Sequence, residues 1–367
     1  MQFRVLACLF AMWLASFNIA PTLAVEKPIS QPLKVGFIMV ESVNDWGWNY
    51  AHDQGRKFLE NTLKGKVQTT FAENVPESAE VERVMEKMIA QGNKLIFATS
   101  YGYLEPALRV AARHPDVIIM ECGRYNSQPM KNVGTYAIRY YDPMYAVGVV
   151  AGRMTKKNEM GYVGGHPVPP LILNLNTFTL GAQSVNPKVK VYVVWTNSWH
   201  DPPTEAEAAK SLIDKGVDVL AAQMDSTLTV VQTAEKNHLY SIGHHADVHH
   251  VAPKGWLTCP CWNWGPLYVQ ITKSVIDHTW KAGNQRFDIK DGGVKLASFG
   301  SAVPKLVRQE ANDIMQRIAD GKLIIFKGPM KDREGNIRIP AGKIADDSYL
   351  EKIDWLVPGV EGALPKK

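Results

Sequence analysis

Hydrophobic and polar residues follow one another along the chain in blocks that predict strands alternating with helices. Residues 34–40, KVGFIMV, form a continuous apolar run of the kind that is buried on both faces of a parallel sheet. In residues 78–91 the apolar side chains recur at helical spacing, and Gly92 supplies the stop signal of that helix. The other elements predicted in this half are helices near 49–63 and 104–113 and strands at 94–98 and 117–120. These repeated units predict a doubly wound parallel sheet.

The pattern restarts in the second half of the chain. Strands are predicted at 160–164 and 189–195. The residues Thr204 to Glu207 have the spacing of a capping box, which predicts a helix that starts at Thr204 and ends at Gly216. A strand at 217–222 follows, and later strands are predicted near 240–243 and 256–258. The repetition predicts a second lobe of similar design.

Aromatic, amide and carboxylate side chains follow nearly every predicted strand. In open α/β sheets, ligands bind at the carboxyl ends of the strands, so these positions are candidate ligand contacts. The candidates are Trp48, Asn49, Tyr101, Glu121, Trp199, Asp225, Asp247 and Trp262. For any one tryptophan a place in the core is the default, and Asp225 or Asp247 could equally cap a helix or bond across a hinge.

The first residues predict export. Residues 1–24 hold one cation, Arg4, then an apolar run from 5 to 20 and a small-residue cleavage site before Val25. The run is too short to cross a bilayer comfortably, and Cys8 lies too early for a lipoprotein signal. We therefore expect a cleaved signal peptide and a soluble protein in the periplasm.

Composition excludes some classes of protein. Removing residues 1–24 lowers the formal net charge from +5 to +4, and both signs are interspersed along the chain. No nucleic-acid partner is expected, because such a protein needs a concentrated basic face.

After removal of residues 1–24, three cysteines remain, Cys122, Cys259 and Cys261, and an odd number cannot form a complete disulfide framework. We expect small buried thiols, although Cys-Pro-Cys could close a strained bridge. A mature chain of about 340 residues is long enough for two lobes.

Five further motifs carry a resemblance to a known family. They are Gly47-Trp48-Asn49 with Gly55, the segment 95–102 (LIFATSYG), the helix 145–152 (YAVGVVAG), the turn 161–165 (GYVGG) and the segment 216–219 (GVDV). In this order they resemble the BMP (basic membrane protein) branch of ABC-transporter solute-binding proteins, the purine- and nucleoside-binding group.

The resemblance implies a fold and a function. The fold would be the type I periplasmic-binding α/β fold, with two doubly wound parallel-sheet lobes joined by a three-crossing hinge. Lobe one would hold residues 31–139 and 248–284, and lobe two 140–247 and 285–367. The protein would be a monomer without a cofactor or catalytic residues, and it would deliver a small molecule to an ABC permease in the inner membrane.

Departures from the family pattern indicate the ligand. Relatives that bind nucleosides carry an Asp and a later Lys that hold the ribose. Here His245 replaces that Asp, Asp247 keeps the next one, and Trp262 stands near the position of the Lys. We therefore expect a free purine base, adenine-like, with a nucleoside as the alternative. Trp48 would stack on the base opposite Trp199 or Trp262, since one such stack contributes roughly 1–3 kcal/mol.

The polar candidates would then bind the edge of the base. Asn49, Glu121, Asp225 and Asp247 are the side chains expected in this role, because a few in-plane polar groups give a flat ligand its orientation. Carboxylates would accept from the amino and ring N–H groups of adenine.

Three other functions are conceivable for this sequence. His244, His245, His249 and His250 are spaced closely enough to suggest a zinc site and a metal-uptake protein. Exposed hinge histidines are the simpler interpretation, so no metal is expected. An enzyme is not expected either, because the sequence lacks a nucleophile elbow, a Walker loop and an HExxH motif. A transcription regulator of the same fold is excluded by the predicted signal and by the lack of an N-terminal DNA-binding helix pair.

Overall fold

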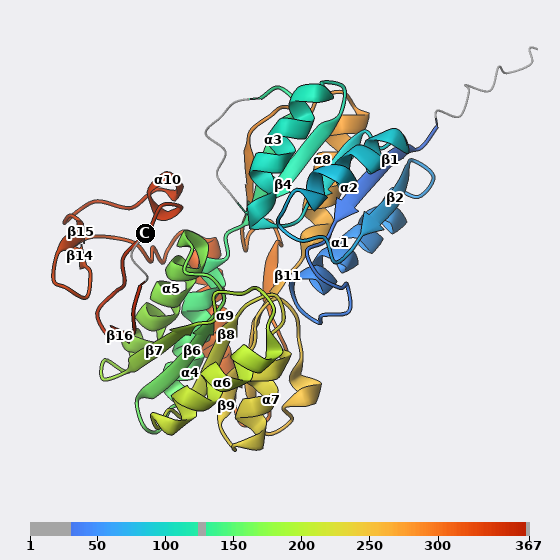
Figure 1. Cartoon of the computed structure of the whole chain (residues 1–367). Coiled ribbons are helices and arrows are strands. Elements are labelled where there is room, and N and C mark those ends of the chain that lie inside the picture. The colour runs from blue at the N-terminus through green and yellow to red at the C-terminus, as the bar shows by residue number, and fades with distance from the viewer. Residues whose placement is uncertain (1–30, 124–129, 365–367) are drawn as a thin grey trace, which may run out of the picture. The chain divides into compact units, whose positions relative to one another are not determined.

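The first lobe is built on a parallel sheet that contains the run KVGFIMV as its second strand (Figure 1). In spatial order its strands are β2 (Val67–Ala72), β1 (Leu33–Ile38), β3 (Leu95–Ala98), β4 (Ile118–Cys122), β5 (Val133–Ile138) and β12 (Asn284–Phe287). All neighbouring strands in this sheet pair in parallel. The last four residues of β1 are buried, as a central parallel strand requires.

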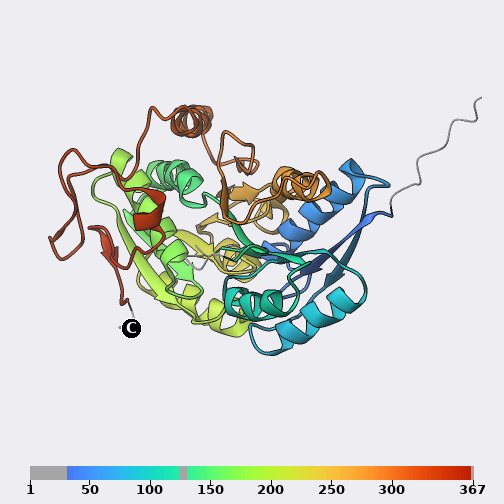
Figure 2. The ribbon, with the colours of Figure 1, turned by 90° about the horizontal axis from the view of Figure 1, so that it is seen from above.

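Helices cover both faces of this sheet. One face packs against α1 (Trp48–Thr62) and α8 (Trp264–Ile276), and the other against α2 (Glu80–Ala90) and α3 (Leu104–Arg113). In Figure 2 the blue α1 and the orange α8 lie side by side, and the cyan and teal helices lie across the sheet from them. The predicted alternation of strands and helices in this half is confirmed.

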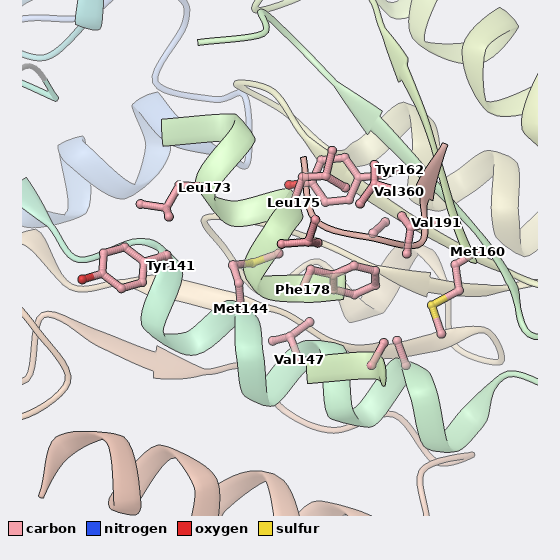
Figure 3. Packing of buried hydrophobic residues seen from close by; sticks show 14 of the residues in the cluster. Tyr141, Met144, Val147, Met160, Tyr162, Leu173, Leu175, Phe178, Val191 and Val360 are labelled. Carbon is pink, nitrogen blue, oxygen red and sulfur yellow. The ribbon is translucent and has the colours of Figure 1, made fainter. Parts of the chain in front are cut away.

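The second lobe repeats the design. In spatial order its sheet contains β16 (Val360–Glu361), β7 (Lys190–Trp195), β6 (Glu159–Gly164), β8 (Val219–Gln223), β9 (Tyr240–Ile242) and β10 (Trp256–Thr258), again all parallel. The helices α4 (Tyr141–Met154) and α5 (Pro169–Val185) cover one face, and α6 (Pro202–Asp214) and α7 (Leu228–Lys236) the other. Figure 3 shows Met144 and Val147 of α4 and Phe178 of α5 packed in the core between these helices and the sheet.

Of the remaining elements, the first belongs to the first lobe, and the others connect the lobes or complete the second one. They are η1 (Tyr101–Tyr103), η2 (His249–Val251), β11 (Pro260–Trp262), β13 (Val294–Leu296), α9 (Lys305–Ala319), β14 (Met330–Lys331), β15 (Ile337–Ile339) and α10 (Asp347–Leu350). Trp355, Leu356 and Val357 follow α10 and are buried in the core beside α4 and α5. The C-terminal segment therefore belongs to the second lobe.

Sheet pairing differs from the expected lobe boundaries in two places. Residues 248–284 were expected in lobe one, but β10 pairs with β9 and so extends the second sheet. Residues 285–367 were expected in lobe two, but β12 runs to Phe287 and pairs with β5 of the first sheet. Within the described chain, the path passes between the two sheets three times: after β5, after β10 and after β12.

The structure is a computed structural model that describes residues 31–123 and 130–364 of the 367-residue chain. The expected signal peptide, residues 1–24, lies outside the described residues. In the described part, none of the helices has the length and apolar character needed to span a membrane.

The structure tests the predicted start of the helix after residue 200 and the predicted state of the cysteines. Helix α6 begins at Pro202, and its cap is the Asp201 carboxylate, which accepts a hydrogen bond from the Thr204 backbone N–H at 3.2 Å. The prediction that the helix starts at Thr204 is therefore wrong, because two prolines fit its first turn.

The prediction of small buried thiols is confirmed, since Cys122, Cys259 and Cys261 are free and buried, with 3.5 Å between the sulfurs of the last two.

Candidate functional site

A cavity lies where the carboxyl ends of the two sheets face each other. Its empty volume is about 550 Å³, a figure that includes space open to solvent. The first lobe contributes Trp48, Ser100, Tyr101, Cys122, Gly123 and Tyr140. The second contributes residues that include Pro170, Leu171, Trp199, Gln223, Asp225 and His244. A mostly apolar hollow with a few polar groups suits a small molecule.

Strand order explains why the cavity forms here. In each sheet the first strand along the chain, β1 or β6, lies between the second and the third. The connections after neighbouring strands therefore leave in opposite directions, and a crevice opens between them. Trp48 and Tyr101 follow β1 and β3, while Pro170 and Asp225 follow β6 and β8.

Trp48 is held in place from several sides. It is the first residue of α1, whose N-terminal N–H groups bond to the Asp45 carboxylate. Its indole N–H donates to the Thr99 carbonyl at 2.6 Å. The ring also packs edge-on against His52 and Trp264, with centroids 4.5 and 5.5 Å away. These contacts fix the ring at the wall of the cavity.

Asn49 connects the lobes and does not line the cavity. It is fully buried, and its side-chain oxygen accepts from the backbone N–H groups of Val40 and Glu41. Its amide donates to Asp45 at 2.8 Å and to Asp225 at 3.4 Å. The side chain is therefore occupied in orienting Asp225.

Of the other predicted site residues, some line the cavity and some do not. Tyr101, Trp199 and Asp225 line the cavity together with Trp48. Glu121 is buried within β4 and is not among the lining residues, whereas the adjacent Cys122 is.

Asp247 and Trp262 also lie outside the lining. The Asp247 carboxylate accepts from the Ser298 backbone N–H at 3.1 Å and from the His249 backbone N–H at 3.0 Å. Trp262 lies behind His245 and donates its indole N–H to His245 Nδ1.

Sequence reasoning missed several lining residues. Gln223 and His244 directly follow predicted strands, so the strand-end rule was sufficient to find them. Tyr140 comes after β5, a strand that the hydrophobic pattern did not predict, so no signal pointed to it.

Backbone and side-chain hydrogen bonds join the two lobes beside the cavity. The Trp48 backbone N–H donates to the Asp225 carbonyl at 2.7 Å. The Trp199 indole N–H donates to the Glu77 carboxylate at 3.3 Å. Gly47 permits the first contact, because a Cβ at this position would lie 1.8 Å from the Asp225 carbonyl oxygen.

Burial changes the protonation of the polar groups in the cavity. It raises the pKa of the Asp225 carboxyl well above its usual range, and the nearby carboxylates of Asp45 and Glu41 raise that pKa further. Burial also lowers the pKa of His244 well below its usual range and that of His245 to about 3. Both imidazoles are therefore neutral at physiological pH.

The four histidines considered for a metal site separate into two pairs. His244 and His245 are buried beside the cavity, whereas His249 and His250 are exposed on η2. Among the residues that the structure describes, His, Cys, Asp and Glu form no group of three or more that could hold a metal ion.

Comparisons with known proteins point to transport. The family model described as ABC transporter substrate-binding protein, PnrA-like (Bmp), matches residues 33–334. A Brucella abortus protein named as purine-binding is 43% identical over 92% of this chain and 95% of its own. An ABC-transporter protein of Haloferax volcanii, named provisionally as glucose-binding, is 30% identical over 91% of this chain and 82% of its own. A solved structure of an ABC-transporter solute-binding protein from Conexibacter woesei superposes with a TM-score of 0.65 at 22% identity, over 79% of this chain and 97% of that one. The expected two-lobed fold of periplasmic-binding proteins is confirmed.

Proposed function

Because the chain belongs to the Bmp family of ABC-transporter substrate-binding proteins, we propose that it captures a purine base between its two lobes. The observation that carries this proposal is the lining of the cavity. The aromatic residues Trp48, Tyr101 and Trp199 line the cavity together with the polar residues Asp225 and His244. Aromatic walls stack on a flat heterocycle, and a few polar groups bind its edge.

The space around His245 favours a base over a nucleoside. Trp262 fills the region where the resemblance implies a ribose-binding Lys, and it is only 7% exposed. Asp247, the one retained family carboxylate, bonds to Ser298 and His249 instead of lining the cavity. Neither group is available to hold a sugar.

The glucose-binding name of the Haloferax relative suggests a sugar as the second candidate. A sugar offers hydroxyls on every side and needs many hydrogen-bond partners. The cavity lining is mainly apolar, with Leu171, Pro170 and Met224 among its residues. A flat heterocycle therefore fits this lining better than a sugar.

Delivery and location complete the proposal. Substrate-binding proteins of ABC importers work outside the cytoplasm and pass a small molecule to a membrane permease. We infer a monomeric periplasmic protein that performs no chemistry on its ligand, in agreement with the signal peptide expected at residues 1–24.

Calorimetry with adenine, hypoxanthine, guanine, adenosine, inosine and glucose tests the ligand class. At least one free base should bind more tightly than either nucleoside, and glucose should not bind. The reason is that the buried Trp262 and His245 occupy the positions where the resemblance implies ribose-binding groups. Tighter binding of a nucleoside than of every base would overturn the preference, and binding of glucose alone would overturn the purine assignment.

Trp48→Ala should weaken binding of the preferred purine by about 1–3 kcal/mol, the contribution of one aromatic–base stack. Trp46→Ala is the matched control, because Trp46 lies two residues before α1 but is exposed and does not line the cavity. Titration calorimetry measures both variants, and thermal melting checks that each is folded. Equal affinities for the two variants would remove Trp48 from the binding site.

A further inference from the structure

His244 is a buried polar residue that no contact within the described chain explains. It lies two residues after the end of β9, is fully buried and lines the cavity. Neither ring nitrogen has a hydrogen-bond partner among the described residues. Its ring contacts are edge-on, to His245 and Trp262, with centroids 4.5 and 5.1 Å away. Burying polar atoms without partners is unfavourable, so an unpartnered imidazole in a cavity points to a ligand.

The neighbouring His245 shows the contrast. The Trp262 indole can only donate, so His245 Nδ1 accepts its hydrogen bond. His245 Nε2 must then carry the proton and donate to the Met224 carbonyl, 2.8 Å away. Both nitrogens of His245 are occupied and its tautomer is fixed. His244 has no such constraint, and its proton can be on either nitrogen.

We propose that His244 is a specificity-determining residue that hydrogen-bonds the edge of the purine, and that its free tautomer allows one site to take both amino- and oxo-purines. This inference rests on the proposed function. Adenine presents an amino donor next to a ring-nitrogen acceptor, whereas hypoxanthine presents a carbonyl acceptor next to a ring N–H donor. At a fixed position along the edge, a residue that can only donate matches the acceptor of one base and meets the donor of the other. A neutral imidazole that exchanges its tautomer matches both.

Two other polar residues of the cavity, Gln223 and Asp225, also offer hydrogen bonds to a purine. The Gln223 side-chain carbonyl accepts from the Tyr162 hydroxyl at 2.6 Å, which orients the amide so that its N–H groups can donate to a ligand. Asp225 is buried beside other carboxylates, which favours its protonated form. A protonated carboxyl group, like the imidazole, offers one donor and one acceptor. The cavity therefore combines a fixed donor with two adaptable groups.

Two variants separate a role in binding from a role in the fold. His244→Phe keeps the ring shape and removes both nitrogens, so adenine and hypoxanthine should each bind about tenfold more weakly or worse. The ligand-free variant should melt no lower than the wild type, because no internal hydrogen bond is lost. His244→Gln should recover part of the affinity for both bases, since an amide also offers a donor and an acceptor. His250→Ala, an exposed histidine outside the lining, is the control and should bind normally.

Nitrogen-15 NMR of the histidine-labelled wild-type protein tests the tautomer directly. The protonated nitrogen of His244 should differ between the adenine and hypoxanthine complexes, while His245 stays protonated on Nε2 in both. Unchanged binding of both bases by His244→Phe would show that His244 does not touch the ligand. One tautomer of His244 in both complexes would overturn the adaptive role. Failure of the wild type to bind either base would instead overturn the proposed function.

Discussion

Gly47→Val is expected to weaken ligand capture strongly while leaving each lobe folded. A Cβ at Gly47 would lie 1.8 Å from the Asp225 carbonyl oxygen and 2.8 Å from its carbon. The Trp48 N–H donates to the same oxygen at 2.7 Å, so the two lobes meet here backbone to backbone. Backbone atoms cannot rotate aside as the end of a long side chain can. The added side chain must therefore hold the lobes apart at this edge of the cavity.

The dissociation constant should rise on the order of 100-fold, which corresponds to about 2.7 kcal/mol. The melting temperature of the ligand-free protein should stay near the wild-type value, because Gly47 packs against the other lobe and not within its own core. Asn44→Val is the control, since Asn44 is exposed in the same loop. If Gly47→Val is folded and binds as tightly as Asn44→Val, capture does not depend on this contact.

The sequence predicted the central strands well and the less regular elements poorly. Residues 34–40 and 94–98 are short apolar runs, and they form β1 and β3 in the middle of the first sheet. Residues 133–138 form a fully buried strand too, but Gly134 and Thr135 interrupt the apolar run. β5 is buried because it pairs with β4 on one side and with β12 on the other, and β12 lies far from β5 in sequence. No local pattern contains that information.

The strand-end rule predicted where the cavity lies but not which side chains point into it. Strand ends do converge on the cavity, and four candidates line it: Trp48, Tyr101, Trp199 and Asp225. The rule places a residue at the edge of the sheet without saying which way its side chain points. Successive residues of a strand point to opposite faces, so Cys122 lines the cavity and Glu121 does not.

The turn after β9 shows the same limit. His244 and His245 line the cavity, whereas Asp247, two residues later, bonds to Ser298 outside the lining. Imidazoles therefore line the cavity at the turn where a carboxylate was expected. Only the three-dimensional path of this turn distinguishes the two, because both residue types are polar and both follow the same strand.

One motif of the sequence has a physical explanation in the second lobe. The segment YAVGVVAG lies in α4, and its first glycine, Gly148, faces α5. A Cβ at Gly148 would lie 2.1 Å from the Phe178 carbonyl oxygen, and one at Gly181 of α5 would lie 2.1 Å from the Tyr145 carbonyl oxygen. The two helices thus approach each other through glycines on both sides. The spacing that carries the family resemblance is the spacing of this close contact.

Gly148→Val should therefore destabilise the protein strongly. The valine side chain meets the backbone of α5 and must force the two helices apart, which opens the core that Phe178 and Val147 fill. Overpacking of this kind should lower the free energy of unfolding by about 3 kcal/mol. Urea denaturation followed by circular dichroism measures the change.

Arg153→Val is the matched control for this prediction. Arg153 lies on the same helix, is partly exposed and pairs with Glu310 at 2.8 Å. A surface ion pair contributes about 0–1 kcal/mol, so the control should lose far less stability. The ligand should still bind the folded fraction of Gly148→Val, because Gly148 contacts α5 and does not line the cavity. A Gly148→Val protein as stable as Arg153→Val would mean that α4 and α5 can separate at little cost, contrary to the packing of this lobe.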